Sequence, residues 1–298
     1  MMIRNVLTAA AALTLATTLV AQTAKPNPQA GFHRIFEPPP TYDFADNTGF
    51  TSLFDGTLKG WSYDPKLWDI QDGAIHIAAT CEKPTGTVYA VSDTGEYGDF
   101  ILKYEMKGTG KINGGMQFRS YVTSDPNASG PKMEPARRTA MPPQPVAAAA
   151  VAAPRSPRPR ECENPGTPPS RESQAKWNMA GPQADFVEDN KYSGMFYEQN
   201  GRAVIALPGF SMFADANGSY AMAQLVDKPT FDSWFHKDDW NQFMVVAIGH
   251  ATSIYMNGHL VTQFVDTDPK YFRPTGKLGV ESESTGDLYT RNIWIKKL

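Results

Sequence analysis

The sequence predicts an all-β domain, either a β-sandwich or a jelly roll, and two observations support this fold class. Short segments that alternate apolar and polar residues recur along most of the 298-residue chain, and strand side chains point to opposite faces in turn. Turn dipeptides separate these segments, most clearly Asp72-Gly73 and Asn257-Gly258, which favour tight hairpins. We find no amphipathic helical period and no internal repeat, so roughly a dozen short strands fit one large domain.

The first residues are typical of an exported protein. Arg4 precedes an apolar run from Val6 to Ala21, which is the pattern of a signal peptide, and we expect residues 1–21 to be removed. A membrane anchor is the weaker alternative, because a membrane span needs roughly 20 apolar residues and this run is shorter. Residues 22–48 are rich in proline and are predicted as an extended leader. The protein is therefore expected in the periplasm or secreted.

The domain is predicted to occupy residues 49–298, and its first strands follow from alternation. Along residues 99–107, the apolar side chains from Phe100 to Met106 share one face, whereas lysine and glutamate take the other. Such a segment is expected to place one face on a core. The strands predicted in this part of the chain are residues 68–71, 74–77, 88–91, 99–107 and 111–122.

Composition changes between residues 123 and 176, where Pro, Ala, Ser and Arg dominate. Such a segment cannot bury enough apolar surface to offset the entropy lost on ordering, so it is predicted to be a disordered insertion. Because the alternating pattern resumes directly afterwards, the insertion interrupts one domain instead of separating two. Its arginines leave open one possible function, which is the recruitment of a partner protein.

Alternation after the insertion predicts a second group of strands. Residues 209–227 form a looser stretch within this part, and no strand is predicted there. The predicted strands are residues 180–186, 193–197, 203–207, 240–248, 251–256, 260–264, 277–283 and 288–295.

Charge and motifs exclude several functional classes. The net charge of -3 and the lack of a basic stripe make nucleic acid an unexpected partner. The sequence has no nucleophile elbow and no phosphate-binding loop. Export permits a disulfide between Cys81 and Cys162, although Cys162 lies in the predicted insertion, and the pairing stays open.

No cofactor is expected, and calcium is the one alternative. The segments Asp266-Thr-Asp268 and Asp215-Ala-Asn217-Gly218 offer oxygen ligands of the kind that calcium prefers. Turn formation explains both segments equally well, because aspartate and asparagine side chains bond to nearby backbone in turns. The histidines do not have the spacing of metal ligands.

Polar side chains gather on one face of the central predicted strands. If residues 111–122, 180–186 and 193–197 are strands, their apolar residues enter one core and their other face presents polar groups together. These polar residues are Gln117, Arg119, Gln183, Asp185 and Tyr197. A purely structural sheet face does not require such a set, so the sequence predicts a site for a polar, hydroxylated ligand.

Several motifs occur in the same order over nearly the whole domain. They include Phe50-Thr-Ser-Leu-Phe-Asp-Gly56, Tyr97-Gly-Asp-Phe100, Asn113-Gly-Gly-Met-Gln-Phe-Arg119, Gly181-Pro-Gln-Ala-Asp185, Trp240-Asn241, Asn257-Gly258 and Arg291-Asn-Ile-Trp-Ile-Lys296. In these motifs the chain from Phe50 to Leu298 resembles the 3-keto-disaccharide hydrolase domain family. The resemblance implies a concanavalin A-like jelly roll of two antiparallel sheets. It also implies an exported enzyme that cleaves glycosides oxidised to a ketone at C3 of the sugar.

The chemistry that the resemblance implies is elimination followed by hydration. The ketone acidifies the C2 proton, a base removes it, the aglycone leaves from C1, and water then adds. Such a site needs a base, a group that holds the enolate and a proton donor. The alternative is a non-catalytic carbohydrate-binding module, because the same fold also serves lectins.

The resemblance also implies roles for individual residues. Asp185 is the first choice for the base, or else fixes sugar hydroxyls, and its alternative is a solvated strand carboxylate. Arg119 is expected to hold the oxyanion, because its planar donors stay charged; alternatively it pairs with a carboxylate only to stabilise the sheet. Gln117 and Gln183 are expected to contact substrate, and Tyr197 is expected to stack on a sugar or donate a proton.

Two glutamates mark a departure from the family pattern. Many relatives carry Gln-x-His where this chain has Glu281 and Glu283, which point the same way. Either Glu283 takes over acid and base work, with Glu281 contacting substrate, or the substrate differs; an exposed acidic pair is the alternative. Trp240 matches the family as well and is expected to lie in the core.

Overall fold

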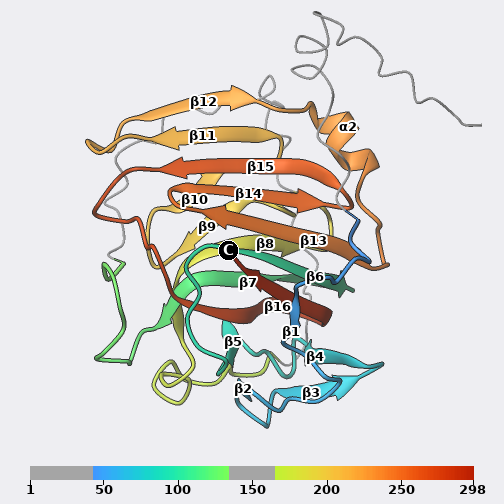
Figure 1. Ribbon diagram of the computed structural model, residues 1–298. Coiled ribbons are helices and arrows are strands. Elements are labelled where there is room, and N and C mark those ends of the chain that lie inside the picture. Colours follow the sequence, from blue (N-terminus) through green and yellow to red (C-terminus); the bar gives the residue numbers. More distant parts are fainter. Residues whose placement is uncertain (1–42, 134–164) are drawn as a thin grey trace, which may run out of the picture. The chain divides into compact units, whose positions relative to one another are not determined.

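The computed structural model describes residues 43–133 and 165–298, which form two packed β-sheets and one short helix (Figure 1). We name the sheets A and B. Sheet A contains β1 (Thr51–Ser52), β3 (Trp68–Gln71), β4 (Ala74–Ala79), β6 (Phe100–Gly108), β11 (Phe210–Ala214), β12 (Tyr220–Gln224), β13 (Asn241–Ile248), β14 (Ala251–Met256) and β15 (His259–Asp266). Sheet B contains β2 (Trp61–Ser62), β5 (Val88–Ser92), β7 (Lys111–Val122), β8 (Met179–Val187), β9 (Phe196–Gln199) and β10 (Ala203–Ala206). Strand β16 (Lys277–Lys297) belongs to both sheets.

Strand β16 makes the corner between the sheets. Its first half pairs with β5 and β7, and its second half pairs with β4 and β6. The change occurs where Ser284 and Gly286 have positive φ angles of 71° and 135°. A Cβ atom on Gly286 would lie 2.0 Å from the carbonyl oxygen of Thr109, so this position requires glycine. The two strands predicted at residues 277–283 and 288–295 are therefore one bent strand.

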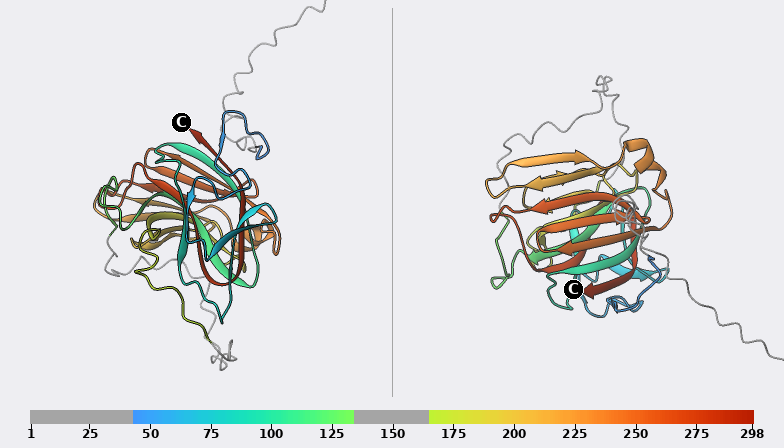
Figure 2. Two further views of the ribbon diagram at one scale, coloured as in Figure 1. Left: turned by 90° about the horizontal axis from the view of Figure 1, so that it is seen from below. Right: turned by 45° about the horizontal axis from the view of Figure 1, so that its top comes forward.

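The core lies between the two sheets, and alternation predicts its composition. Phe100, Leu102 and Tyr104 of β6 are all fully buried, and the Tyr104 ring stacks on Phe243 of β13 at 5.3 Å. The two views in Figure 2 show the two strand layers from other sides. The fold is the all-β, concanavalin A-like jelly roll that the sequence predicts.

Some elements differ from the sequence-based expectation. Within residues 209–227, where no strand was predicted, the chain forms β11 and β12. Strand β11 runs parallel to β15, so one pair departs from the antiparallel pattern. The short helix α2 (Lys228–Ser233) was also not predicted; the Asp227 side chain caps it by accepting from the Thr230 amide at 2.9 Å. Strands β11 and β12 were missed because β12 is the edge strand of sheet A and both carry exposed apolar residues, such as Phe213 and Met222.

The end of the predicted leader is held against sheet A. The Lys103 side chain is fully buried, and its Nζ atom donates to the carbonyl oxygens of Phe44 and Asp46 and to the side chain of Asn47, each at 2.7 Å. Burial lowers the pKa of the Lys103 ammonium. The predicted signal peptide and the leader up to residue 42 lie outside the described residues.

Both ends of the predicted insertion belong to the ordered domain. The indole nitrogen of Trp177 donates to Ser62 at 3.2 Å, and the Gln174 amide donates to Asp64 at 2.7 Å. The Gly166 amide donates to the Cys81 carbonyl oxygen at 2.9 Å. At the other end, the Thr123 amide donates to the Asn178 carbonyl oxygen and the Met133 amide donates to the Tyr121 hydroxyl, each at 2.8 Å. Residues 123–133 and 165–176 of the predicted insertion therefore bond to the domain. Residues 134–164 lie outside the described residues.

One of the two cysteines lies within the described residues. Cys81 is disulfide-bonded, and Cys162 lies outside the described residues. In the part of the chain that the structure describes, no helix has the length and apolar character that a membrane crossing requires.

Candidate active site

Neighbouring strands of sheet B align the predicted polar residues in two rows. In one row, Glu281 of β16 lies opposite Gly115 of β7, which lies opposite Asp185 of β8. In the next row, Gln117 of β7 pairs with Gln183 of β8, which pairs with Tyr197 of β9. The structure therefore brings the carboxylate, the amides and the phenol of the sequence-based prediction onto the same face, together with Glu281.

Gly115 leaves a gap between two buried carboxylates, and an amide fills it. A Cβ atom at Gly115 would lie 2.4 Å from Nε2 of Gln183 and 2.6 Å from the carbonyl oxygen of Ala184. In the space that glycine leaves, Nε2 of Gln183 donates to Glu281 at 3.0 Å and lies 3.4 Å from Oδ1 of Asp185. One amide nitrogen thus bridges both carboxyl groups.

The orientation of the bridging amide is set by a chain of hydrogen bonds. Ser120 donates to Oε1 of Gln117 at 2.8 Å, and Nε2 of Gln117 donates to Oε1 of Gln183 at 2.8 Å. An amide has one acceptor and one donor end. Because the oxygen of Gln183 is already an acceptor for Gln117, its NH₂ group faces the carboxylates.

Burial and mutual repulsion favour the protonated forms of these two acids. Burial raises the pKa of Asp185 well above 3.8, and the negative charge of Glu283 adds to this effect. The pKa of Glu281 is likewise raised well above 4.5 by burial, by Glu283 and by Asp185, against the opposing Gln183 hydrogen bond. Buried acids with raised pKa values are candidates for proton transfer.

Glu283 is the third and more accessible acid of the cluster. It is half-buried, and its Oε1 atom accepts from Asn113 at 2.6 Å while its Oε2 atom accepts from Thr87 at 3.0 Å. Two donors at these distances hold a carboxylate in one orientation. The expectation of an exposed acidic pair therefore fits neither glutamate.

Two tyrosines complete this face as hydrogen-bond donors. Tyr89 of β5 lies opposite Glu281, and sequence reasoning missed it because residues 88–91 carry no other polar residue. Burial raises the pKa of Tyr89 well above 10.0 and also raises the pKa of Tyr197. Both phenols therefore stay protonated, and Tyr197, which is half-buried, can donate to a ligand.

The structure places Arg119 away from these acids. Strand β7 has one extra residue between Gln117 and Tyr121 relative to both of its neighbours, and Arg119 has a positive φ of 46°. A bulge of this kind turns the following side chains to other faces. The guanidinium donates to the carbonyl oxygens of Gly98 (2.9 Å) and Gly249 (2.8 Å) and to Asp99 (2.9 Å). Arg119 thus joins loops of sheet A, which corrects its expected place beside Asp185.

A cavity of about 480 Å³ adjoins the acid cluster. Its lining includes Thr87, which bonds to Glu283, and Tyr89, which lies opposite Glu281. Gln199 also lines it, as does Arg171, the only cation among the described residues of the lining. Arg171 belongs to the segment that was predicted to be disordered, so nothing in the sequence pattern pointed to it.

The aspartates of the two segments that offer calcium-type ligands bond to protein groups. Asp266 is bonded to Arg202 at 2.5 Å, which places a positive charge where a cation would have to bind. Asp215 accepts from the amides of Asn217 and Ser219, each at 2.8 Å, as a turn residue does. Within the described ranges, no three His, Cys, Asp or Glu side chains are arranged to hold a metal ion.

The fold and the acid cluster define a jelly-roll protein with a cluster of buried acids on the outer face of one sheet. The chain belongs to the family of 3-keto-alpha-glucoside-1,2-lyase-like domains, whose model matches residues 49–296. This membership supports a carbohydrate-active function. No curated protein matches the chain.

Three solved structures illustrate what the chain is similar to. A "putative glycosyl hydrolase" from Parabacteroides distasonis is 15% identical, with 84% of this chain and 94% of that chain covered and a TM-score of 0.45. The carbohydrate-binding module CBM66 from Bacillus subtilis is 12% identical, with 80% and 96% covered and a TM-score of 0.43. The β-glucanase of Bacillus licheniformis is 10% identical, with 86% and 95% covered and a TM-score of 0.37.

The Glu281→Gln variant is expected to become more stable relative to the wild type as pH rises. The folded-state pKa of Glu281 is raised above its ordinary value of 4.5, so the folded state binds more protons than the unfolded state above that pH. The wild-type free energy of unfolding should therefore fall, relative to Glu281→Gln, as pH rises above about 4.5. Urea denaturation of both proteins checks this, with exposed Glu172→Gln as the control. A pH-independent difference between Glu281→Gln and wild type would contradict the raised pKa.

Proposed function

We propose that this protein cleaves glycosides that carry a ketone at C3 of the sugar. The observation that carries the proposal is the pair of buried acids, Asp185 and Glu281, which are 6% and 3% exposed and bridged by Gln183. Acids with raised pKa values suit proton transfer from carbon, and the family description names a 1,2-lyase.

The proposed reaction has two stages, and no oxidant is required. In the first stage a carboxylate takes the proton from C2, and the electrons of that bond form an enolate with the C3 ketone. The enolate then returns to the ketone as a C1=C2 double bond forms and the C1–oxygen bond breaks. The leaving oxygen takes a proton from the site. In the second stage water adds its oxygen to C1, and C2 regains a proton. The sum is hydrolysis of the glycosidic bond.

We assign the proton from C2 to Asp185 and the proton for the leaving oxygen to Glu281, whose raised pKa favours its protonated form. Asp185 is bridged to Glu281 by the amide of Gln183, so a proton gained by one acid lowers the cost of ionising the other. Glu283 is the more accessible acid; Asn113 and Thr87 hold it in place, and it would accept a hydrogen bond from a sugar hydroxyl. The developing enolate oxygen would receive a hydrogen bond from the Tyr197 phenol.

We also propose where the rest of the substrate binds and where the protein works. The cavity that Tyr89 and Arg171 help to line has the size of a small-ligand site, which is typically about 300–1000 Å³, and would hold the departing sugar or aglycone. Export to the periplasm or the medium is proposed from Arg4 and the apolar run that ends at Ala21.

Incubation with a panel of 3-keto-disaccharides, followed by mass spectrometry, tests the activity. We expect release of the keto-sugar, no cleavage of the unoxidised disaccharides, and one solvent deuterium at C2 when the reaction runs in heavy water. Cleavage of unoxidised sugar at an equal rate, or product without solvent deuterium at C2, would rule out the elimination mechanism. Binding of keto-sugar without turnover would favour the non-catalytic, lectin-like function.

A further inference from the structure

A second cavity lies on the outer face of sheet A, on the opposite side of the core from the acid cluster. Its volume is about 430 Å³, and it crosses four adjacent strands. Glu105 of β6, Gln242 of β13 and Asn257 at the end of β14 line it, as does His259 of β15. Three strand spacings separate β6 from β15, which makes the cavity about 14 Å long.

Two tryptophans stand at opposite ends of this cavity. The Trp234 ring is parallel to the His259 ring, with centroids 4.1 Å apart, so it lies at the β15 end. The Trp240 ring packs against the guanidinium of Arg291 at 3.8 Å and lies 5.1 Å from the Lys107 ammonium, so it lies at the β6 end. Trp240 was expected in the core, but it follows the loop before β13 and is half-exposed.

The polar groups between the tryptophans have unused hydrogen-bonding capacity. Oε2 of Glu105 accepts from Arg291 at 2.8 Å and from Asn292 at 2.7 Å, whereas its Oε1 accepts from Gln242 at a longer distance of 3.4 Å. His236 uses Nδ1 on the Trp240 carbonyl oxygen at 3.2 Å, and its Nε2 has no partner among the described residues. The lining therefore offers both acceptors and donors, and Arg291 offsets the charge of Glu105.

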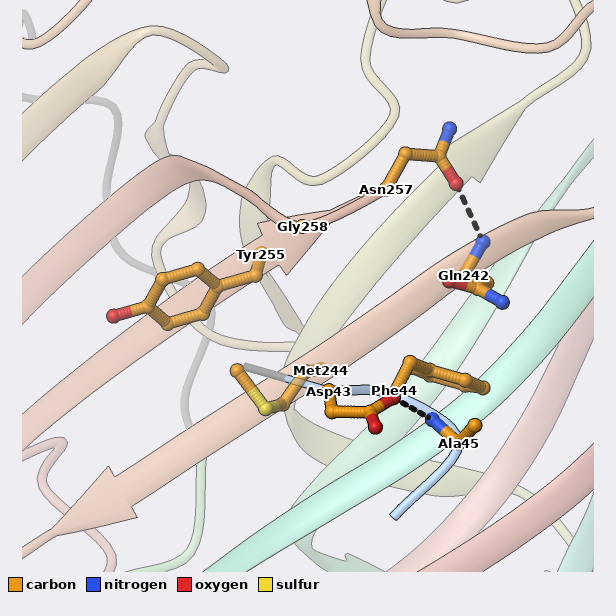
Figure 3. Close-up of a pocket in the computed structure, with 8 residues that line it drawn as sticks. All are labelled: Asp43, Phe44, Ala45, Gln242, Met244, Tyr255, Asn257 and Gly258. Atoms are coloured by element: carbon orange, nitrogen blue, oxygen red, sulfur yellow. Dashed lines mark hydrogen bonds between the residues drawn. The ribbon is translucent and has the colours of Figure 1, made fainter. Parts of the chain in front are cut away.

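A smaller cavity of about 250 Å³ continues this surface along β13 and β14 (Figure 3). It shares Gln242 and Asn257 with the first cavity, and the Tyr255 ring lies along it. Its far wall is the segment around Phe44, which Lys103 holds in place. The two cavities together form a groove that suits an extended ligand.

We propose that this groove is a second carbohydrate-binding site, for a neutral oligosaccharide of at least two rings. Aromatic side chains combine a flat apolar face with a polar environment, which matches a sugar ring, whose faces are apolar and whose edge carries hydroxyls. Both negatively and positively charged side chains lie around the groove, which favours a neutral ligand over an anion or a cation. A ligand bound here would tether the enzyme to a glycan without occupying the acid cluster on sheet B.

Isothermal titration of the full chain with unoxidised cellotriose, maltotriose and laminaritriose tests the proposal. We expect at least one of these to bind, and Trp234→Ala and Trp240→Ala to weaken its binding by about tenfold or more. Phe213→Ala is the matched control, because Phe213 is a 41% exposed aromatic of sheet A outside the groove. Asp185→Asn should bind the trisaccharide as the wild type does.

Two results would overturn the second site. One is that none of the three trisaccharides binds the wild type. The other is that Asp185→Asn abolishes binding while the tryptophan variants retain it, which would place the sugar at the acid cluster. If the tryptophan variants do not fold, the exposed side chains of His236 and Asp239 decide, since His236→Ala and Asp239→Ala should each weaken binding and unchanged affinity in both would reject the site. The proposed 3-keto activity is measured separately, so failure of either proposal leaves the other testable.

Discussion

Asp185→Asn is expected to reduce kcat for a 3-keto-disaccharide by about 100- to 10,000-fold, the usual range for loss of a general base. Asparagine keeps the shape of the side chain but cannot accept a proton. Its buried position beside Gln183, which bridges it to Glu281, also leaves little room for water to act in its place. Steady-state kinetics on the purified variant, with circular dichroism to confirm folding, gives the measurement.

The same substitution nearby provides a matched control. Asp189 follows β8 and is exposed, and its side chain accepts from the Lys191 amide at 3.0 Å. Asp189→Asn should therefore leave kcat unchanged. Near-normal activity of Asp185→Asn would remove Asp185 as the base and would transfer the assignment to Glu281 or Glu283. A substrate with deuterium at C2 should also react more slowly with the wild type, because that C–H bond breaks in the first stage.

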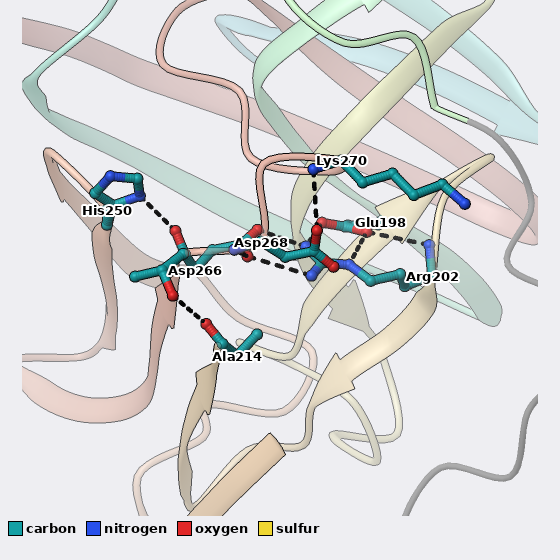
Figure 4. Close-up of polar contacts among 8 residues, drawn as sticks. Glu198, Arg202, Ala214, His250, Asp266, Asp268 and Lys270 are labelled. Atoms are coloured by element: carbon teal, nitrogen blue, oxygen red, sulfur yellow. Dashed lines mark hydrogen bonds and ion pairs between the residues drawn. The ribbon is translucent and has the colours of Figure 1, made fainter. Parts of the chain in front are cut away.

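Arg202→Met is expected to lower the free energy of unfolding by about 3–5 kcal/mol, the usual cost of removing one partner from a buried ion pair. Arg202 bonds two buried carboxylates at once (Figure 4): Nε lies 2.8 Å from Glu198, and the guanidinium contacts Asp266 at 2.5 Å. The guanidinium also lies 4.6 Å from the centre of the Tyr271 ring. Without the arginine, both acids stay buried without their partner. Urea denaturation at neutral pH measures the loss.

Two comparisons test the cause of that loss. Adding Glu198→Gln and Asp266→Asn to Arg202→Met should recover much of the stability, because no unpaired charge then remains. Lys228→Met removes an exposed ion pair with Asp232 and should cost less than about 1 kcal/mol. An equal cost for Arg202→Met and Lys228→Met, or no recovery in the triple variant, would show that the buried charges are not the reason.

The sequence by itself determined which side chains share a face. A strand has a period of two, so alternation placed Phe118 and Phe186 toward the core and Gln117 and Asp185 on the other face before any strand was paired. It also determined the hairpin at Asn257-Gly258. These properties depend on neighbours along the chain, and local sequence contains that information.

Only the tertiary structure decided which of those side chains meet. The pairing of β16 with β7 brought Glu281 level with Gly115 and Asp185, and no local pattern contains that register. The extra residue in β7 turned Arg119 toward the loops of sheet A, although its parity in the sequence matched Asp185. A bulge depends on the pairing with the strands on either side, which local sequence does not contain. Gly181 and Gly276 leave room for the bulge in β7, since a Cβ atom on either glycine would lie within 2.5 Å of β7 atoms.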